Sequence, residues 1–199
     1  MDASSWDDRY SATDLVWSAG PNQFVAEVCA PLPPGRAIDL AAGEARNTLW
    51  LAEQGWDATA VDFSAVALDK ARRIAARRGL AITTVEADLT GYTPDERAYD
   101  LVLIAYLQIR VTELATVVGR AAAAVAPGGR LLLIGHDVSN IEHGYGGPSD
   151  PAVLTDAAAV VEAIGPQLTV ERAEVADREV STDDGPRTAK DTLVLAHRD

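Results

Sequence analysis

The sequence predicts an α/β fold with a mostly parallel sheet of seven strands, helices on both faces and a C-terminal antiparallel hairpin. From residue 36 onward, short apolar segments alternate with segments whose apolar residues recur at helical spacing. This alternation favours βαβ units with right-handed crossovers. A glycine-containing turn joins the first strand to a helix, and two strand-like segments separated by a polar, acidic stretch end the chain.

Apolar spacing and capping residues place the individual elements. Ser64 is a good N-cap for a helix that Gly79 ends as its C-cap. The run Tyr99–Ala105 is continuously apolar, as expected of a strand buried on both faces. The predicted strands are 37–42, 57–63, 81–86, 99–105, 130–135, 167–174 and 191–197; the predicted helices are 46–54, 64–79, 112–126 and 155–165; and 136–151 is predicted to be a long loop.

The length of 199 residues predicts a single domain over 1–199, with a core over 36–199 and an N-terminal helical segment over 1–35. The N-terminal segment contains Trp6, Tyr10, Trp17 and Phe24 and is expected to form one or two short helices. It serves either as a hydrophobic cover over the sheet or as a lid over a ligand, and both interpretations fit the pattern.

The composition narrows the possible partners. The net charge of −13 repels phosphate backbones and anionic membrane surfaces, so we expect neither nucleic acid nor a membrane as a partner. The single cysteine, Cys29, is expected to be a small buried apolar residue, and the cytoplasm is the expected location. No histidine or cysteine cluster has the spacing of metal ligands, so no metal is predicted. The basic run around Lys70 is expected to be a solvated helix face.

The turn after the first strand limits the ligand. Gly43 stands where the backbone must approach a ligand closely, and the helix that follows presents free N–H groups. A pyrophosphate requires a turn with three glycines, whereas this turn has one glycine and also carries Glu44. A dinucleotide, and with it a nicotinamide-dependent oxidoreductase, is therefore disfavoured.

Three acidic residues stand at the ends of consecutive strands. Asp62 can accept from both ribose hydroxyls, and Asp88 can accept from an adenine amino group. Asp39 lies in the first strand, where we expect its carboxylate to face the ligand crevice, repel phosphate and attract an ammonium or sulfonium group. A positively charged nucleoside on a Rossmann-like sheet fits all three.

These segments resemble the class I S-adenosylmethionine-dependent methyltransferases, and within them the small bacterial type related to tellurite-resistance and thiopurine methyltransferases. The resemblance covers nearly the whole chain. It is carried by Trp6-Asp7-Asp8-Arg9-Tyr10, Ile38-Asp39-Leu40-Ala41-Ala42-Gly43-Glu44-Ala45-Arg46-Asn47, Val61-Asp62-Phe63-Ser64, Ala87-Asp88-Leu89 and Pro127-Gly128-Gly129. The family usually has a second glycine where Ala45 stands, and the turn is strained if Ala45 requires a positive φ.

The resemblance implies S-adenosylmethionine as cofactor, S-adenosylhomocysteine as product and a set of residues that bind them. Asp39, Ala41 and Gly43 would line the methionine part, Asp62 the ribose and Phe63 the adenine. The complete set of implied cofactor-binding residues is Asp39, Ala41, Gly43, Arg46, Asn47, Asp62, Phe63, Asp88, Leu89 and Ala105.

The catalytic candidates follow the fourth and fifth strands. His136 comes directly after the fifth strand, where Asp137 or another acid could orient it as a general base. Tyr106, just past the fourth strand, is implied to border the methyl-transfer site. The residues expected to contact the substrate are Tyr10, Trp17, Tyr106, His136 and Tyr145.

The predicted function is methyl transfer from S-adenosylmethionine to an oxygen, nitrogen, sulfur or other nucleophilic atom of a small molecule. The alternative is a protein that binds S-adenosylmethionine without catalysis, as a scaffold. The sequence leaves the acceptor open and is compatible with a monomer or a homodimer.

Overall fold

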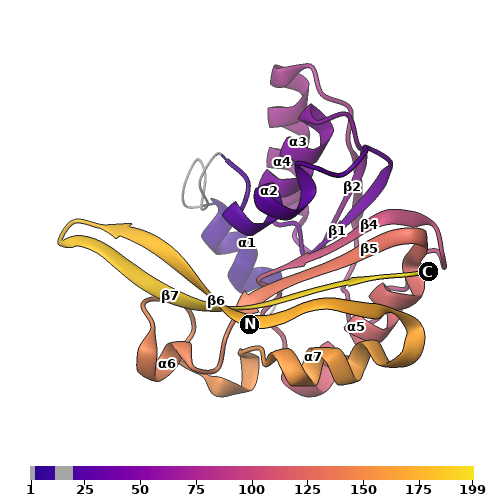
Figure 1. The fold of residues 1–199 in the computed structure, drawn as a ribbon. Coiled ribbons are helices and arrows are strands. Elements are labelled where there is room, and N and C mark those ends of the chain that lie inside the picture. Colours follow the sequence, from indigo (N-terminus) through magenta and orange to yellow (C-terminus); the bar gives the residue numbers. More distant parts are fainter. Residues whose placement is uncertain (1–2, 12–19) are drawn as a thin grey trace.

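The computed structural model describes residues 3–11 and 20–199. Its seven strands form one sheet with the order β3-β2-β1-β4-β5-β7-β6 (Figure 1). The helices are α1 (Ala3–Ser11), α2 (Gln23–Cys29), α3 (Arg46–Glu53), α4 (Ala65–Arg78), α5 (Val111–Ala124), α6 (Asn140–His143) and α7 (Ala157–Ile164). The strands are β1 (Arg36–Leu40), β2 (Asp57–Asp62), β3 (Thr83–Glu86), β4 (Tyr99–Ala105), β5 (Val125–His136), β6 (Thr169–Thr182) and β7 (Gly185–His197). The α/β prediction is confirmed, with β1 to β5 parallel and β7 antiparallel to both β5 and β6.

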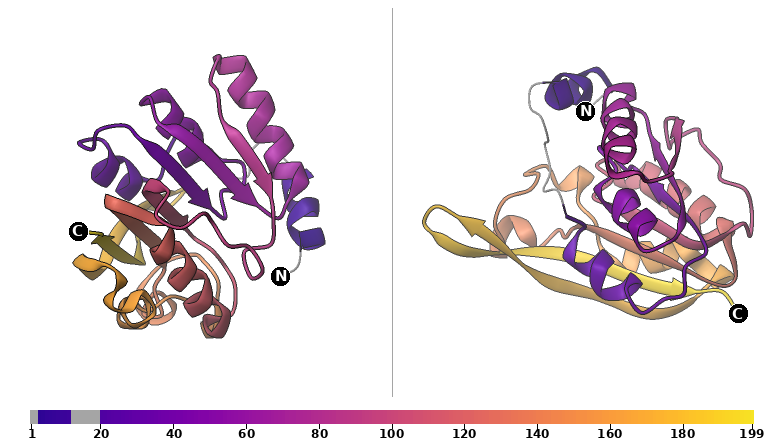
Figure 2. Two further views of the ribbon diagram at one scale, coloured as in Figure 1. Left: turned by 90° about the vertical axis from the view of Figure 1, so that its right-hand side faces the viewer. Right: turned by 90° about the horizontal axis from the view of Figure 1, so that it is seen from above.

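Helices cover both faces of the sheet, as predicted (Figure 2). Side chains alternate between the faces of a strand, and β4 shows the result. Leu101 and Leu103 pack with α2 and α3 in one core cluster, whereas Val102 and Ile104 pack with α5 and α7 in another. The central strands are therefore apolar on both sides, which is why they read as continuous runs in the sequence.

The predicted capping of α4 is confirmed, and that of α7 is corrected by one residue. Ser64 accepts from the Ala67 amide, and Gly79 adopts a left-handed conformation at the other end of α4. The N-cap of α7 is Asp156, which accepts from the Ala159 amide. Thr155, the predicted cap, instead forms an isolated bridge with Asp137.

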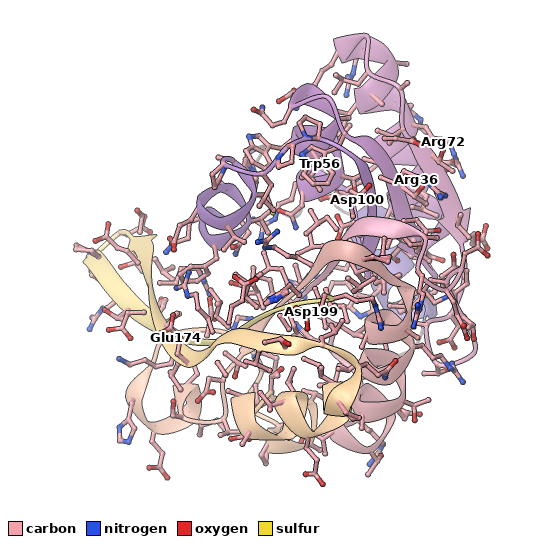
Figure 3. The ribbon with its side chains drawn as sticks, turned by 45° about the vertical axis from the view of Figure 1, so that its right-hand side comes forward. Arg36, Trp56, Arg72, Asp100, Glu174 and Asp199 are labelled. Atoms are coloured by element: carbon pink, nitrogen blue, oxygen red, sulfur yellow. The ribbon has the colours of Figure 1, made fainter. Side chains whose placement is uncertain are left out.

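Strand β5 begins earlier than predicted, because Pro127-Gly128-Gly129 lie within it rather than between a helix and a strand. Helix α5 ends at Ala124, and the pairing of β4 with β5 is irregular between Tyr99 and Leu101. A side chain at position 129 would clash with the Tyr99 carbonyl at 2.8 Å, so a glycine is required at this irregularity. At the same end of the sheet, the Asp100 side chain accepts from the Arg36 amide (Figure 3).

The C-terminal hairpin is much longer than predicted. The stretch between 174 and 191, expected to be a polar connection, is paired strand on both sides of a tight turn at 182–185. Residues 191–197 of β7 pair with β5, whereas residues 185–190 pair only with β6 and project from the body of the molecule (Figure 1). Because residues 186–188, next to the turn, are exposed, this part of the hairpin lacks the apolar pattern of a buried strand.

The segment 136–151 is more ordered than the predicted loop, since it contains α6 and leads into a 3₁₀ turn at Pro151–Val153. Polar side chains attach it to β7. Asp137 accepts from the Thr192 hydroxyl at 2.6 Å, and Asn140 accepts from the Lys190 amide at 2.7 Å. The segment is therefore held against the hairpin.

The N-terminal segment forms two short helices, as expected. Helix α1 packs on α4, where Trp6 and Tyr10 stack with ring centroids 5.5 Å apart and contact Ala67. Lys70 donates to the Tyr10 carbonyl and forms an ion pair with Glu44 at 3.0 Å. The expectation of a solvated basic face on α4 is therefore wrong at Lys70. Its side chain links α4 to α1 and to the turn between β1 and α3.

Cys29, the last residue of α2, is buried. Burial, with the nearby Asp39 charge, raises the pKa of its thiol to about 12. The thiol is a packing residue, as expected. Among the described helices, none is long and apolar enough to cross a membrane.

Candidate active site

The turn between β1 and α3 has three residues in the left-handed region. Ala41, Gly43 and Ala45 have φ values of 66°, 55° and 59°. Only glycine adopts this conformation without cost; for each alanine the cost is about 1 kcal/mol. The turn therefore has the conformation that the sequence analysis identified as strained, and non-glycine strain of this kind concentrates at functional sites.

Asp62, at the end of β2, fixes this turn. One carboxylate oxygen accepts from the Gly43 amide at 2.8 Å, and the other accepts from the Ser64 amide at 2.9 Å. Burial raises the pKa of Asp62, although these amides and that of Phe63 counteract the rise. Each oxygen keeps a second lone pair that can accept from a ligand hydroxyl.

Asp39 lies behind the turn rather than in a cavity wall, which corrects the expectation that it faces the crevice. Its side chain is buried, and one oxygen accepts from the Thr48 hydroxyl at 2.8 Å. The other oxygen has no hydrogen-bond partner among the residues that the structure describes. Burial raises the pKa of Asp39 to about 6. A buried carboxylate with an unused acceptor favours a cationic ligand in front of the turn.

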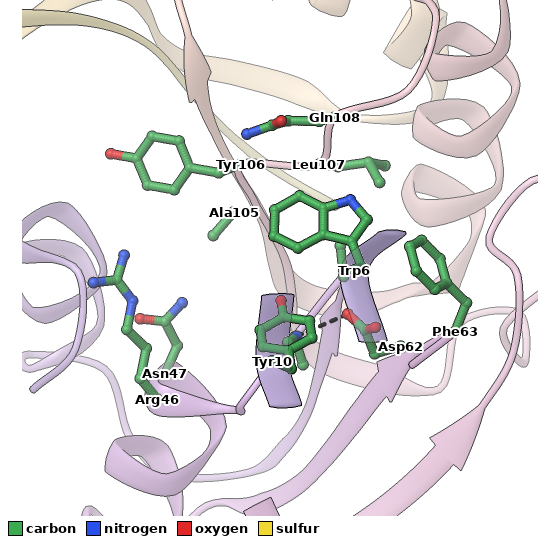
Figure 4. Close-up of a pocket in the computed structure, with 13 residues that line it drawn as sticks. Trp6, Tyr10, Arg46, Asn47, Asp62, Phe63, Ala105, Tyr106, Leu107 and Gln108 are labelled. Carbon is green, nitrogen blue, oxygen red and sulfur yellow. Dashed lines mark hydrogen bonds between the residues drawn. The ribbon is translucent and has the colours of Figure 1, made fainter. Parts of the chain in front are cut away.

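A first cavity, here called the inner cavity, opens directly above this turn (Figure 4). Its lining residues come from α1, the β1–α3 turn, the end of β2 and the segment after β4. They are Trp6, Tyr10, Ala41, Ala42, Gly43, Arg46, Asn47, Asp62, Phe63, Ala105, Tyr106, Leu107 and Gln108. The structure thus brings together most of the predicted cofactor-binding residues and adds Trp6 (Figure 4).

A second cavity of about 490 Å³, here called the outer cavity, continues from the inner one and shares Ala41, Asp62 and Phe63 with it. Asp88 and Leu89 line it, as predicted from their place after β3. Asp88 is exposed, and one of its oxygens already accepts from the Thr90 amide and hydroxyl. Its other oxygen remains for a ligand.

A third cavity of about 300 Å³, here called the polar cavity, lies on the other side of Arg46 and Tyr106, which line both it and the inner cavity. Its other lining residues are Pro21, Asn22, Gln23, His136 and Arg178. The two predicted catalytic residues therefore lie together, with ring centroids 4.7 Å apart. A left-handed conformation at Tyr106, with φ of 58°, places its side chain at this boundary.

Asp191 on β7 is the centre of the hydrogen bonds around the polar cavity, and its side chain is fully buried. The Tyr106 hydroxyl and the Arg178 Nε both donate to its Oδ2 at 2.6 Å. Its Oδ1 lies 3.4 Å from His136 Nδ1. Burial alone raises the pKa of Asp191, but the interactions with His136, Arg178 and Tyr106 outweigh it and hold the pKa below its usual range.

Tyr106 is held from two sides. Its hydroxyl accepts from the Asn22 side-chain amide at 3.1 Å, and Asn22 in turn accepts from the Phe24 amide as the N-cap of α2. Burial and the Asp191 charge raise the pKa of Tyr106. Tyr106 therefore stays a neutral hydrogen-bond donor rather than a base.

Several sequence expectations are corrected here. Asp137, the first of the acids expected to orient His136, instead accepts from Ser139 and Thr192, and the acid that faces His136, at 3.4 Å, is Asp191. Tyr145 is 45% exposed and lines none of the cavities described. Tyr10 lines the inner cavity rather than the polar one. Trp17 lies outside the described residues.

Sequence reasoning missed Asn22, Arg178 and Asp191. Asn22 precedes a helical segment as an N-cap would, which explains it without a ligand. Arg178 lay within the stretch read as a polar connection, and Asp191 was read only as the start of the last strand. The available signal was pairing: His136 ends β5, and Asp191 lies within the antiparallel β7, directly opposite His136 in the register.

Three comparisons place this geometry among known proteins. A family model described as "Methyltransferase domain" matches residues 37–129, which include the turn, Asp62 and Asp88 and end before His136. A demethylmenaquinone methyltransferase from Thermus thermophilus is 34% identical over 123 residues, which are 61% of this chain and 54% of that protein. The chain thus matches about half the length of this curated relative.

Two solved structures share the fold. TehB from Haemophilus influenzae has a TM-score of 0.76 and 16% identity, covering 98% of this chain and 67% of that one. An S-adenosylmethionine-dependent methyltransferase from Mesorhizobium loti has a TM-score of 0.65 and 20% identity, covering 85% of this chain and 94% of that one. The chain is therefore similar to a methyltransferase domain over residues 37–129, and it shares the fold of these two solved structures.

Proposed function

We propose that this protein transfers the methyl group of S-adenosylmethionine to a nucleophilic atom of a small molecule. The observation that carries the proposal is the continuity of the three cavities at the carboxyl edge of the sheet. The outer and inner cavities share Asp62 and Phe63, and the inner and polar cavities share Arg46 and Tyr106. A cofactor bound across the first two would present its reactive end to the third.

The residues present fit this cofactor. The free lone pairs of Asp62 suit ribose hydroxyls, and the unused oxygen of Asp39 supplies negative charge behind the turn. Arg46 and Asn47, at the start of α3, suit the carboxylate of the methionine part. Phe63 and Leu89 would contact the adenine in the outer cavity.

When bound, S-adenosylmethionine supplies an electrophilic methyl group on a sulfonium. The residues of this chain have to align the acceptor with that group and exclude water. Tyr106 lines both the inner and the polar cavity, His136 lines the polar one, and together they would hold the acceptor there. The polar cavity, at about 300 Å³, is at the small end of the range for ligand pockets, which favours a small acceptor.

Calorimetry with S-adenosylmethionine and S-adenosylhomocysteine tests cofactor binding directly, and absence of binding at millimolar concentration would refute the proposal. A screen of phenols, thiols and heterocycles, read as homocysteine release after enzymatic hydrolysis of the product, tests transfer. The control variant Tyr145→Phe changes an exposed residue outside the cavities and is expected to retain both binding and turnover.

A second candidate is a protein that binds the cofactor without catalysis. The left-handed Ala41 and Ala45 favour it, because the strain in the turn costs free energy that cofactor binding must offset. This candidate predicts binding of S-adenosylhomocysteine with no turnover on any acceptor of the screen.

A further inference from the structure

His136 and Asp191 form a pair that the register of β5 and β7 builds directly. The two residues are opposite each other, with Nδ1 of His136 3.4 Å from Oδ1 of Asp191. Neither atom has a hydrogen-bond partner among the described residues. A side chain at Gly147 would come within about 3.0 Å of the imidazole, so the 136–151 segment also packs against the ring. The carboxylate and the segment together fix the ring orientation.

The other oxygen of Asp191 is already committed. Oδ2 accepts from both Tyr106 and Arg178, which leaves Oδ1 as the acceptor that faces the imidazole. An acceptor at this place favours the tautomer with the proton on Nδ1, so Nε2 of His136 becomes the basic nitrogen. Because His136 lines the polar cavity, we expect this nitrogen to reach an acceptor bound there.

The charge of the polar cavity limits what that acceptor can be. Arg46 and Arg178 both line it, and none of its described lining residues is acidic. Asp191, behind the wall, offsets one of the two guanidinium charges. An acceptor that binds as an ammonium ion is disfavoured here, whereas an oxygen that becomes negative is stabilised.

We propose, on the basis of the function proposed above, that His136, positioned by Asp191, is the general base for an acceptor of the phenol class. The O–H proton passes to Nε2 of His136, and the oxygen forms a bond to the methyl carbon. The carbon–sulfur bond breaks with its electron pair remaining on sulfur, and His136 releases the proton to solvent. Arg178 stabilises the phenolate oxygen, and Asp191 stabilises the imidazolium.

Ionisation of a bound phenol tests this step without turnover. The probe is 4-nitrophenol, followed by its phenolate absorption one pH unit below its solution pKa, with and without S-adenosylhomocysteine. We expect the ratio of phenolate to phenol to be at least tenfold higher for the bound probe than for the free probe in the wild-type protein. We expect this gain to be lost in His136→Gln. His143→Gln is the matched control, since His143 is exposed and lies outside the cavity; it is expected to behave as wild type.

Asp191→Asn tests the positioning role by nitrogen-15 NMR of the His136 ring. Because Tyr106 and Arg178 donate to one oxygen, the asparagine oxygen is expected to remain there and its NH₂ to face Nδ1. The proton then moves to Nε2, and turnover on phenols is expected to fall at least a hundredfold while thiophenolates, already ionised, change less than threefold. A merely structural role would not change the tautomer.

The proposal is overturned if 4-nitrophenol fails to bind at millimolar concentration, binds in its neutral form, or is ionised equally by His136→Gln. An Nε2-protonated ring in the wild-type protein also overturns it. The probe and NMR measurements need no cofactor, so their failure is distinguishable from failure of S-adenosylhomocysteine binding, which would refute the underlying function instead.

Discussion

The cofactor end and the polar cavity lie at one edge of the same sheet but are built in different ways. Asp39, Gly43 and Asp62 belong to one βαβ unit, and the hydrogen bond from Gly43 to Asp62 spans nineteen residues. The polar cavity joins Asn22, Tyr106, His136, Arg178 and Asp191, which are spread over almost the whole chain. A substitution in the cofactor end changes contacts within one unit, whereas a substitution in the polar cavity breaks contacts between distant segments. The two regions should therefore respond differently to substitution.

Asp62→Asn should produce the largest effect and separate the two regions. The variant weakens the bonds from the Gly43 and Ser64 amides and two proposed bonds to ribose, so the Kd for S-adenosylhomocysteine is expected to rise several hundredfold, about 3.5 kcal/mol. Calorimetry measures this. Asp88→Asn is the matched control, because Asp88 is exposed, and its Kd should change less than about fivefold. Equal effects at both positions would contradict the assignment of the ribose to Asp62.

Asp191→Ala tests the polar cavity through stability. Removing the carboxylate leaves Tyr106 and Arg178 without their buried acceptor, and the free energy of unfolding is expected to fall by about 3 kcal/mol. Urea denaturation measures the loss. Asp177→Ala removes an exposed carboxylate paired with Lys190 and should cost less than about 0.5 kcal/mol. A comparable loss in both variants would mean that the Asp191 network does not stabilise the fold.

Asp39→Asn should stabilise the protein without cofactor and weaken cofactor binding. The folded-state pKa of Asp39 is raised from 3.8 to about 6, so keeping it ionised costs stability. The free energy of unfolding of the wild-type protein therefore falls, by the contribution of Asp39, as pH rises from about 4 through 6. The variant avoids this loss and is expected to be about 3 kcal/mol more stable at pH 8.

Urea denaturation at two pH values checks the Asp39 prediction. At pH 4 the carboxyl is protonated in the folded state and only about half ionised in the unfolded state, so most of the advantage of Asp39→Asn should disappear. An advantage that is the same at pH 4 and pH 8 would show that it does not come from ionisation of Asp39. Weaker binding of S-adenosylhomocysteine by the same variant would link the unfavourable charge to function.

The smallest expected effect concerns the strained turn. Ala41→Gly relieves a left-handed alanine that is only half-buried, and stability should rise by about 1 kcal/mol, or about 3 °C in Tm. Ala45→Gly relieves the same strain but removes a fully buried methyl group worth about 0.8 kcal/mol, so its net effect should be near zero. Thermal unfolding compares them; a clear stabilisation by Ala45→Gly alone would show that the strain lies mainly there.

Elements whose residues lie close together in the sequence were predicted more accurately than sites that join distant segments. The strands β1, β2 and β4 and the caps of α4 were predicted correctly in kind, because each depends on neighbours within one supersecondary unit. Most of the predicted cofactor residues line one cavity, and their role stays a prediction. Asp39 was expected at the crevice, but the chain places it behind the turn against Thr48. The hairpin was predicted too short because the residues next to its turn are exposed and therefore show no apolar pattern.

The sequence by itself determined the α/β class, the glycine turn with Asp62 beside it and a ligand other than a pyrophosphate, since periodicity, capping and turn chemistry act over short distances. The tertiary structure alone decided that Asp191, rather than Asp137, faces His136, and that Arg178 and Asn22 complete the polar cavity. The physical reason is register. Antiparallel pairing of β7 with β5 sets residue 191 opposite residue 136, and this pairing depends on the packing of the whole sheet.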